Sequence, residues 1–119
     1  MVIMNELIKY TLDFLKVLSD QTRLEILNLL KGAPKSSKDL EVALNKKQPS
    51  ISQQLKILYN SNLITFETIE NNNKKKTKYY KLKDTNIFNI ISSIQSYVAK
   101  INNQKIKDLQ NLDIIDTLS

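Results

Sequence analysis

The segment Gln48-Pro49-Ser50-Ile51-Ser52-Gln53-Gln54-Leu55-Lys56-Ile57-Leu58 has the spacing of an amphipathic helix with two unlike faces. Ile51, Leu55 and Leu58 recur at i, i+4 and i+7, the stripe that a helix turns toward a protein core. Pro49 suits the first turn, where its missing N–H is no loss. Ser and Gln occupy the other positions of the first turns, in place of the Glu and Lys of an ordinary solvated helix. The segment therefore predicts a helix whose free face contacts a polar partner, and the base edges of the DNA major groove are the leading candidate.

The residues before this segment predict two further helices. Ser19-Asp20 offers an N-cap for a helix over 21–31, which Gly32-Ala33-Pro34 ends. Ser36 or Ser37 can cap a short helix over 38–45. The polar turn Asn45-Lys46-Lys47-Gln48 then leads into the opening segment, whose helix runs to about residue 61. Two helices joined by so short a turn predict a helix-turn-helix over 37–61, and Asn tolerates left-handed backbone next best after Gly.

The hydrophobic pattern changes from a period of 3.6 to a period of two after Asn62. Residues 64–69 alternate as a β-branched and aromatic strand, Asn71-Asn72-Asn73 is a turn, and residues 77–82 are a second strand. The predicted β-hairpin over 63–83 carries Lys74-Lys75-Lys76 at its tip. Alone, such a lysine run is usually a solvated loop. Because this basic hairpin directly follows the predicted helix-turn-helix, we interpret it as a wing that lies along phosphates.

The two ends of the chain carry more apolar surface than one small domain can cover. A helix over 5–18 is apolar on more than one face, and Asp84-Thr85 can cap a last helix over 86–116. The apolar stripe of the last helix slips at Asn102-Asn103, so the helix is either continuous or broken near Asn103. We expect the two helices to pair subunits across a two-fold axis; alternatively, the first helix is wrapped on two sides by its own domain. The expected interface residues are Leu7, Ile8, Phe14, Ile94, Val98 and Ile101.

Composition argues against most catalytic and metal chemistry. The chain has no His, no Cys and a single Gly, Gly32. Catalytic triads, ordinary zinc sites and Gly-rich phosphate loops all need these residues. We therefore expect no enzyme, no cofactor and no metal site. The start of the chain does not resemble a signal peptide and the apolar runs are shorter than a membrane span, so we expect a cytoplasmic protein without a membrane partner.

The positive charge of the chain is concentrated in its middle. The formal net charge is +6. Residues 31–83 hold twelve Lys against four acidic residues, a balance of +8, and the two ends together have a balance of −2. A basic footprint over the helix-turn-helix and the hairpin favours a nucleic acid partner over mere solubility.

Three segments together resemble the ArsR-type family of winged-helix transcriptional repressors. The run Leu18-Ser19-Asp20-Gln21-Thr22-Arg23-Leu24-Glu25-Ile26-Leu27 is similar to that family's "L-x-D-x-T-R-x-x-I-L" opening. The opening segment, followed by Asn62-Leu63-Ile64, resembles its recognition helix, where "S-x-S-x-H-L-K-x-L…G-L-V" is common. The basic hairpin matches its wing. The likeness covers nearly the whole chain and implies a homodimeric repressor that binds a pseudo-palindromic operator in double-stranded DNA.

Two departures from the family pattern bear on function. Gln53 and Gln54 stand where the family often has two His, which changes the preferred sequence but leaves DNA binding in place. The Cys cluster or the carboxylate and His set of the metal-sensing members is missing, so metal sensing is not carried over and any effector stays unknown.

The resemblance also implies which residues contact DNA. Arg23, in the opening motif, either contacts phosphate or holds the subunit together, and we favour the second interpretation. The expected base-reading residues are Ser50, Ser52, Gln53 and Gln54. The expected phosphate-binding residues are Lys46, Lys47, Lys56, Lys74, Lys75, Lys76 and Lys78.

The fold class that follows is mainly α with a small β-hairpin. We expect a single winged helix-turn-helix domain over 1–119, with elements in the order α-α-α-α-β-β-α and terminal helices that form a dimer interface. The partners would be double-stranded DNA and a second copy of the chain. The main alternative is a winged helix used only for protein–protein contact, without an operator of its own.

Overall fold

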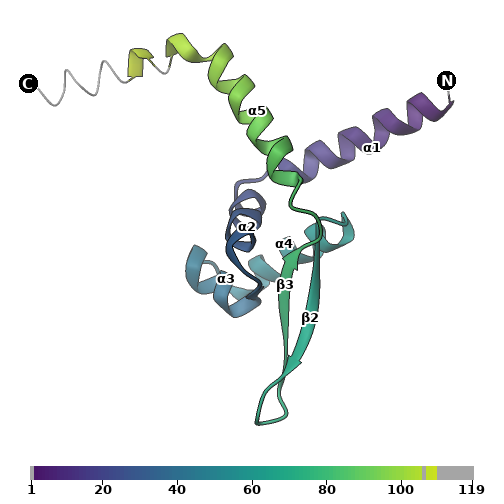
Figure 1. Ribbon diagram of the computed structural model, residues 1–119, viewed down its shortest axis with the longest axis vertical. Coiled ribbons are helices and arrows are strands. Elements are labelled where there is room, and N and C mark those ends of the chain that lie inside the picture. The colour runs from purple at the N-terminus through teal and green to yellow at the C-terminus, as the bar shows by residue number, and fades with distance from the viewer. Residues whose placement is uncertain (1, 106, 110–119) are drawn as a thin grey trace, which may run out of the picture. The chain divides into compact units, whose positions relative to one another are not determined.

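The computed structural model of the protein describes residues 2–105 and 107–109 (Figure 1). The chain forms two compact units, Met1–Asp84 and Thr85–Ser119. The elements of the first unit are α1 (Val2–Leu18), α2 (Gln21–Gly32), β1 (Lys35–Ser36), α3 (Ser37–Leu44), α4 (Gln48–Asn60), β2 (Ile64–Glu70) and β3 (Lys76–Leu82). The second unit contains α5 (Ile87–Ile101). Mainly helical structure with one small β-hairpin is confirmed.

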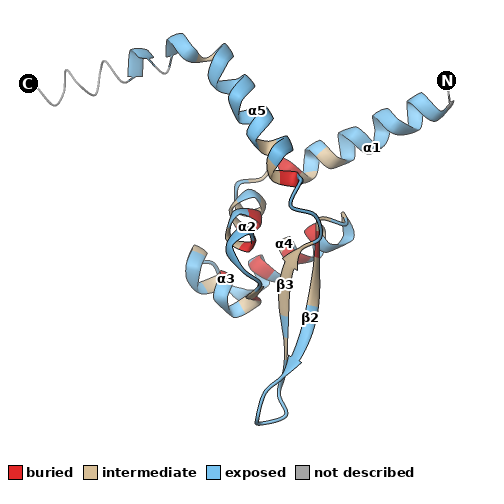
Figure 2. Cartoon of the chain, viewed as in Figure 1, coloured by how far each residue is buried: buried red, intermediate tan, exposed pale blue. Residues whose placement is uncertain are grey.

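The core of the first unit lies under the helix-turn-helix. Ile51, Leu55 and Leu58 of α4 are all buried, as their spacing predicts. They share the core with Leu40 of α3 and with Ile64 at the start of β2. Buried positions appear in red on α2, α4 and the upper end of the hairpin, whereas the lower part of the hairpin is exposed (Figure 2).

The helix boundaries follow from local capping chemistry. The Asp20 carboxylate accepts a hydrogen bond of 3.0 Å from the backbone N–H of Arg23 and so caps α2. Asn45 ends α3 in the left-handed conformation, at φ 53° and ψ 48°. The connection between α3 and α4 is therefore residues 45–47, and Gln48 already belongs to α4. The expectation that Asn45 takes the position usually held by Gly is confirmed.

A two-residue strand, β1, was not expected from the sequence. It pairs antiparallel with β3, Lys35 opposite Tyr80 and Ser36 opposite Tyr79, so that the sheet order is β1-β3-β2. The element order is therefore α-α-β-α-α-β-β-α. Ser36 also caps α3, because its hydroxyl accepts from the N–H of Asp39 while the Asp39 carboxylate accepts from the N–H of Ser36. These hydrogen bonds lower the pKa of Asp39.

The hairpin of β2 and β3 extends beyond the helices of its unit (Figure 1). Its register runs from Ile64 opposite Leu82 to Glu70 opposite Lys76. In the connecting loop, the Asn71 side chain accepts hydrogen bonds from the backbone N–H groups of Asn73 and Lys75. Lys74 has a φ of 60°, a left-handed conformation in which Gly would be more usual.

The helix of the second unit begins at a different residue from the one expected, whereas its end matches one of the two expected alternatives. Its N-cap is Asn86, so the prediction that Asp84 or Thr85 caps the helix is wrong. The Asn86 side chain accepts from the side-chain amide of Asn89 at 3.3 Å. α5 ends at Ile101, and helical backbone resumes at 103–105 and 107–109 after a turn at Asn102. The side-chain amide of Asn102 donates to the Val98 carbonyl, which is the competition with helix backbone that favours Asn at helix ends.

Over the described residues, the last helix is therefore interrupted after Ile101, which is the second of the two alternatives expected from the sequence. The rest of the predicted span, 110–116, lies outside them. No helix within the described ranges is both long enough and apolar enough to cross a membrane.

Candidate nucleic-acid interface

The α4 helix turns three of the four expected base-reading side chains to its exposed side. Ser50, Ser52 and Gln53 are exposed, as is Lys56 one turn further on. Because Ile51, Leu55 and Leu58 anchor the opposite face in the core, the exposed side is held in one orientation. Serine hydroxyls and a glutamine amide can both donate to and accept from base edges.

Gln54 is set apart from the other three. It is only partly exposed, and its side-chain oxygen accepts a hydrogen bond of 2.7 Å from Nη1 of Arg23. Arg23 also donates through Nε to the carbonyl of Val17 at 2.6 Å and through Nη2 to the carbonyl of Lys16 at 3.2 Å. The guanidinium thus joins the end of α1 to the recognition helix α4. The interpretation of Arg23 as a residue that holds the subunit together is confirmed.

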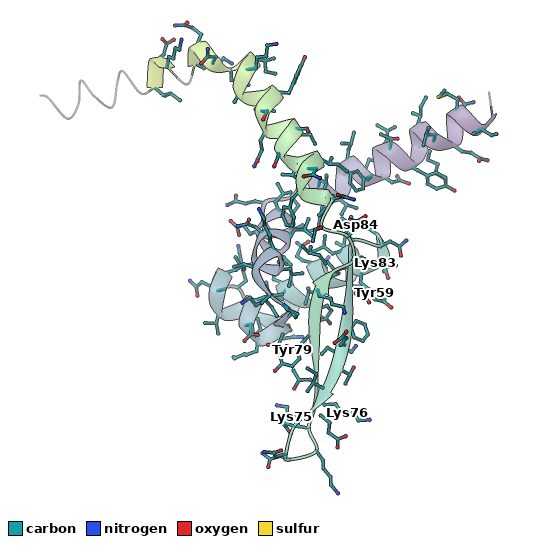
Figure 3. The ribbon with its side chains drawn as sticks, in the orientation of Figure 1. Tyr59, Lys75, Lys76, Tyr79, Lys83 and Asp84 are labelled. Carbon is teal, nitrogen blue, oxygen red and sulfur yellow. The ribbon has the colours of Figure 1, made fainter. Side chains whose placement is uncertain are left out.

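The expected phosphate-binding lysines of the first unit are exposed in three places. Lys46 and Lys47 lie in the turn before α4, and Lys56 lies on α4 itself. The other four lie on the hairpin. Figure 3 shows Lys75 and Lys76 at its tip, away from the helices. Lys74 precedes them in the connecting loop.

Lys78 differs from the lysines at the tip. Its Nζ lies 4.6 Å from the centroid of the Phe66 ring, on the adjacent strand. Phe66 in turn contacts Tyr59 of α4 and Tyr80 of β3, with ring centroids 5.4 Å and 5.7 Å apart. Burial raises the pKa of the Tyr80 phenol, which keeps it neutral.

These rings form the floor of a cleft between α4 and the hairpin. We call it the aromatic cleft, and its lining residues are Ser52, Leu55, Lys56, Tyr59, Phe66, Lys78 and Tyr80. The three aromatic residues were not among the site residues expected from the sequence. A signal was present for two of them, because Phe66 and Tyr80 fall on the same face of the predicted hairpin.

The opposite face of the hairpin has a different electrostatic character. There Lys81 forms a salt bridge and hydrogen bond with Glu67, which lowers the pKa of that carboxyl group. Lys81 is thereby neutralised locally, whereas Lys78 faces the aromatic cleft. The two faces therefore differ in available positive charge.

The described residues form no metal-binding cluster at these surfaces. Over residues 2–105 and 107–109, no group of three or more His, Cys, Asp or Glu side chains comes together that could hold a metal ion. What the arrangement offers is hydrogen bonding from α4 and positive charge from the turn and the hairpin, which is the chemistry that binds a DNA groove and its phosphates.

Comparisons with known proteins agree with this arrangement. A family model described as "Bacterial regulatory protein, arsR family" matches residues 20–65, from the N-cap of α2 to the start of β2. The transcriptional repressor SdpR of Bacillus subtilis (strain 168) is 34% identical over 88 residues, which cover 74% of this chain and 92% of that protein.

Solved structures show the same fold at lower sequence identity. Rv0081 of M. tuberculosis has a TM-score of 0.71 at 21% identity, covering 84% of this chain and 96% of that one. Reduced HlyU from Vibrio cholerae N16961 has a TM-score of 0.64 at 24% identity, with coverage of 82% and 97%. The homodimeric winged helix-turn-helix DNA-binding domain of Mb0332 from Mycobacterium bovis has a TM-score of 0.66 at 19% identity, with coverage of 81% and 84%. This chain belongs to the ArsR family of bacterial regulatory proteins, and it is a DNA-binding transcriptional regulator with the winged helix-turn-helix fold.

Proposed function

We propose that the protein is a repressor that binds a pseudo-palindromic operator as a homodimer. The observation that carries this proposal is the anchoring of α4, which buries one face completely and presents Ser50, Ser52 and Gln53 beside a basic hairpin. The similarity to the repressor SdpR supports the direction of regulation.

In this proposal the base contacts come from α4 and most of the affinity comes from phosphates. Gln53 is suited to a bidentate hydrogen bond with adenine N6 and N7, and the two serines accept a wider range of partners. The exposed lysines of the turn and hairpin neutralise phosphates and fix the register on the duplex. Gln54 is reassigned to positioning α4, because its oxygen is occupied by Arg23.

The dimer is supported by apolar side chains that are exposed in the single chain. On α1, the exposed fractions of Leu7 and Ile8 are 56% and 51%. On α5, those of Ile94, Val98 and Ile101 are 43%, 47% and 62%. Phe14, also on α1, is partly buried. Surfaces of this kind mark protein contacts, and a two-fold dimer would place two α4 helices about 34 Å apart, one turn of DNA.

The role of the hairpin tip is tested by replacing Lys74, Lys75 and Lys76 together with Ala. We expect weaker binding to all DNA sequences alike and a salt dependence whose logarithmic slope falls by about 0.9 for each phosphate that is no longer neutralised. Fluorescence anisotropy on operator and mixed-sequence duplexes across a salt series measures both quantities.

The matched control replaces Lys100, Lys105 and Lys107 with Ala, which removes the same charge from the second unit and leaves the hairpin unchanged. Equal losses in the two variants would show that net charge, not docking of the wing, supports binding. An unmodified protein with neither measurable affinity for mixed-sequence DNA nor a salt dependence would instead favour a protein–protein module.

A further inference from the structure

We propose that the aromatic cleft is a binding site for one phosphodiester of the DNA backbone and its deoxyribose. Lys78 and Lys56 would hold the phosphate, and the rings of Phe66 and Tyr80 would pack against the sugar. This inference rests on the proposed function, because it takes DNA to lie along the exposed side of α4. It adds a contact that lies between the recognition helix and the hairpin tip.

Lys78 is already held in place before any ligand binds. Its ammonium group lies 4.6 Å from the centroid of the Phe66 ring, in a cation–π contact. Phe66 is itself fixed between Tyr59 and Tyr80. A lysine restrained in this way loses less conformational freedom when it binds an anion than the lysines of the loop.

The charge of the cleft favours an anion. It contains Lys78 from β3 and Lys56 from α4, and none of the described residues that line it is acidic. Glu67 lies on the other face of the hairpin, where it pairs with Lys81. The cleft therefore combines two cationic groups with an aromatic floor. This combination complements a phosphate that is attached to a deoxyribose ring.

The sugar–phosphate backbone is the part of DNA that can enter such a cleft. Bases in a duplex are stacked inside and reach a side cleft only after flipping, which costs unpairing and unstacking energy. The backbone is on the outside and needs no such change. Ser52, which lines the cleft and also belongs to the base-reading side of α4, places the site next to the edge of the groove.

The test compares Lys78→Ala with Lys81→Ala. Both substitutions remove one positive charge from β3, but Lys81 is on the opposite face and paired with Glu67. We expect Lys78→Ala to weaken operator binding about tenfold for each half-site and to lower the logarithmic salt slope by about 0.9 for each phosphate that Lys78 no longer neutralises. Lys81→Ala should stay close to the parental protein in both measurements.

Phe66→Leu tests the restraint on Lys78 without a change of charge. It should weaken binding although all lysines remain, and the double variant with Lys78→Ala should lose less than the two single losses combined, because both act through one contact. Circular dichroism and thermal unfolding check that each variant folds. Lys78→Ala decides the question by itself if Phe66→Leu does not fold.

Neutral methylphosphonate groups, placed one at a time in the operator, locate the phosphate. One position in each half-site should weaken binding by the parental protein and leave binding by Lys78→Ala unchanged. The proposal is overturned if Lys78→Ala behaves like Lys81→Ala, or if every position affects the two proteins alike. A parental protein that binds no DNA would overturn both this inference and the proposed function, whereas operator binding without a Lys78-dependent phosphate overturns this inference alone.

Discussion

Gln53 and Gln54 are neighbours with identical side chains, yet the helix gives them opposite surroundings. Gln53 is exposed on the side of α4 that carries Ser50 and Ser52. Gln54 lies at the border of the buried stripe, and its oxygen accepts from Arg23 at 2.7 Å. The Arg23 side chain is only 13% exposed, so its partners are not easily replaced by water. Each glutamine therefore serves as the control for the other.

We predict that Gln53→Ala relaxes sequence preference while leaving stability unchanged, and that Gln54→Ala does the reverse. Losing a bidentate base contact costs about 1–3 kcal/mol of discrimination at one position. Losing a hydrogen bond to a charged, partly buried guanidinium costs about 1.5 kcal/mol of unfolding free energy. Selection of bound sites from random DNA measures the first effect, and urea unfolding measures the second. A Gln54→Ala variant with parental stability and altered site preference would show that Gln54 reads bases.

The sequence alone could not separate these two residues. The family resemblance places both on the recognition helix, and the helical period only shows that Gln54 borders the stripe of Ile51 and Leu58. The partner that decides its role, Arg23, is 31 residues away. A contact of that separation leaves no local pattern, although the interpretation of Arg23 itself could be made from its place at the start of α2.

Among the elements, those with local signals could be predicted and those without could not. Asp20 caps the start of α2, Ser36 caps the start of α3 and Asn45 ends α3, and the side chains or backbone preferences of these residues act within a few residues. β1 has only two residues, too few for any periodicity, and exists because β3 pairs with it. The aromatic cleft likewise needs α4 and the hairpin to be packed before Tyr59 and Phe66 meet.

The N-terminus of α3 has a pH dependence whose sign follows from its capping box. Hydrogen bonds with Ser36 hold the pKa of Asp39 below its ordinary value of 3.8. The ionised carboxylate therefore contributes stability above that ordinary value, and the contribution is lost as the pH falls through the lower pKa of the folded state. Ser36 is buried, so the box also joins α3 to the small sheet.

We accordingly predict that Asp39→Asn lowers the urea midpoint at pH 7 and that the difference from the parental protein narrows below about pH 4. The variant keeps the shape of the side chain but removes the charge at the helix N-terminus, where a negative charge is favourable. Asp13→Asn on α1 is the control, since it removes the same charge outside the first turn of its own helix. A difference that stays constant from pH 7 to pH 3 would contradict the linkage.

At the scale of the whole molecule, the unexplained feature is apolar surface at both ends of the chain. Leu7 and Ile8 on α1, like Val98 and Ile101 on α5, are about half exposed or more. Among the α1 side chains that the structure describes, only that of Leu18, at the end of the helix, is buried. The alternative in which its own unit wraps α1 on two sides therefore receives no support from the described residues. A second copy of the chain remains the partner that we propose for this surface.

We predict that Leu7→Glu produces a monomer, whereas Asn5→Glu on the opposite side of α1 does not. Both substitutions introduce one negative charge at exposed positions of the same helix, but only Leu7 lies in the proposed interface. Sedimentation equilibrium measures the assembly state. Because two linked half-sites gain affinity from the high local concentration of the second helix, the monomer should bind a full operator about 100-fold more weakly or worse, and a single half-site as well as the parental protein does. If Leu7→Glu stays dimeric, α1 is not in the interface; if it becomes monomeric but keeps full-operator affinity, dimerisation through α1 is not what places the recognition helices on DNA.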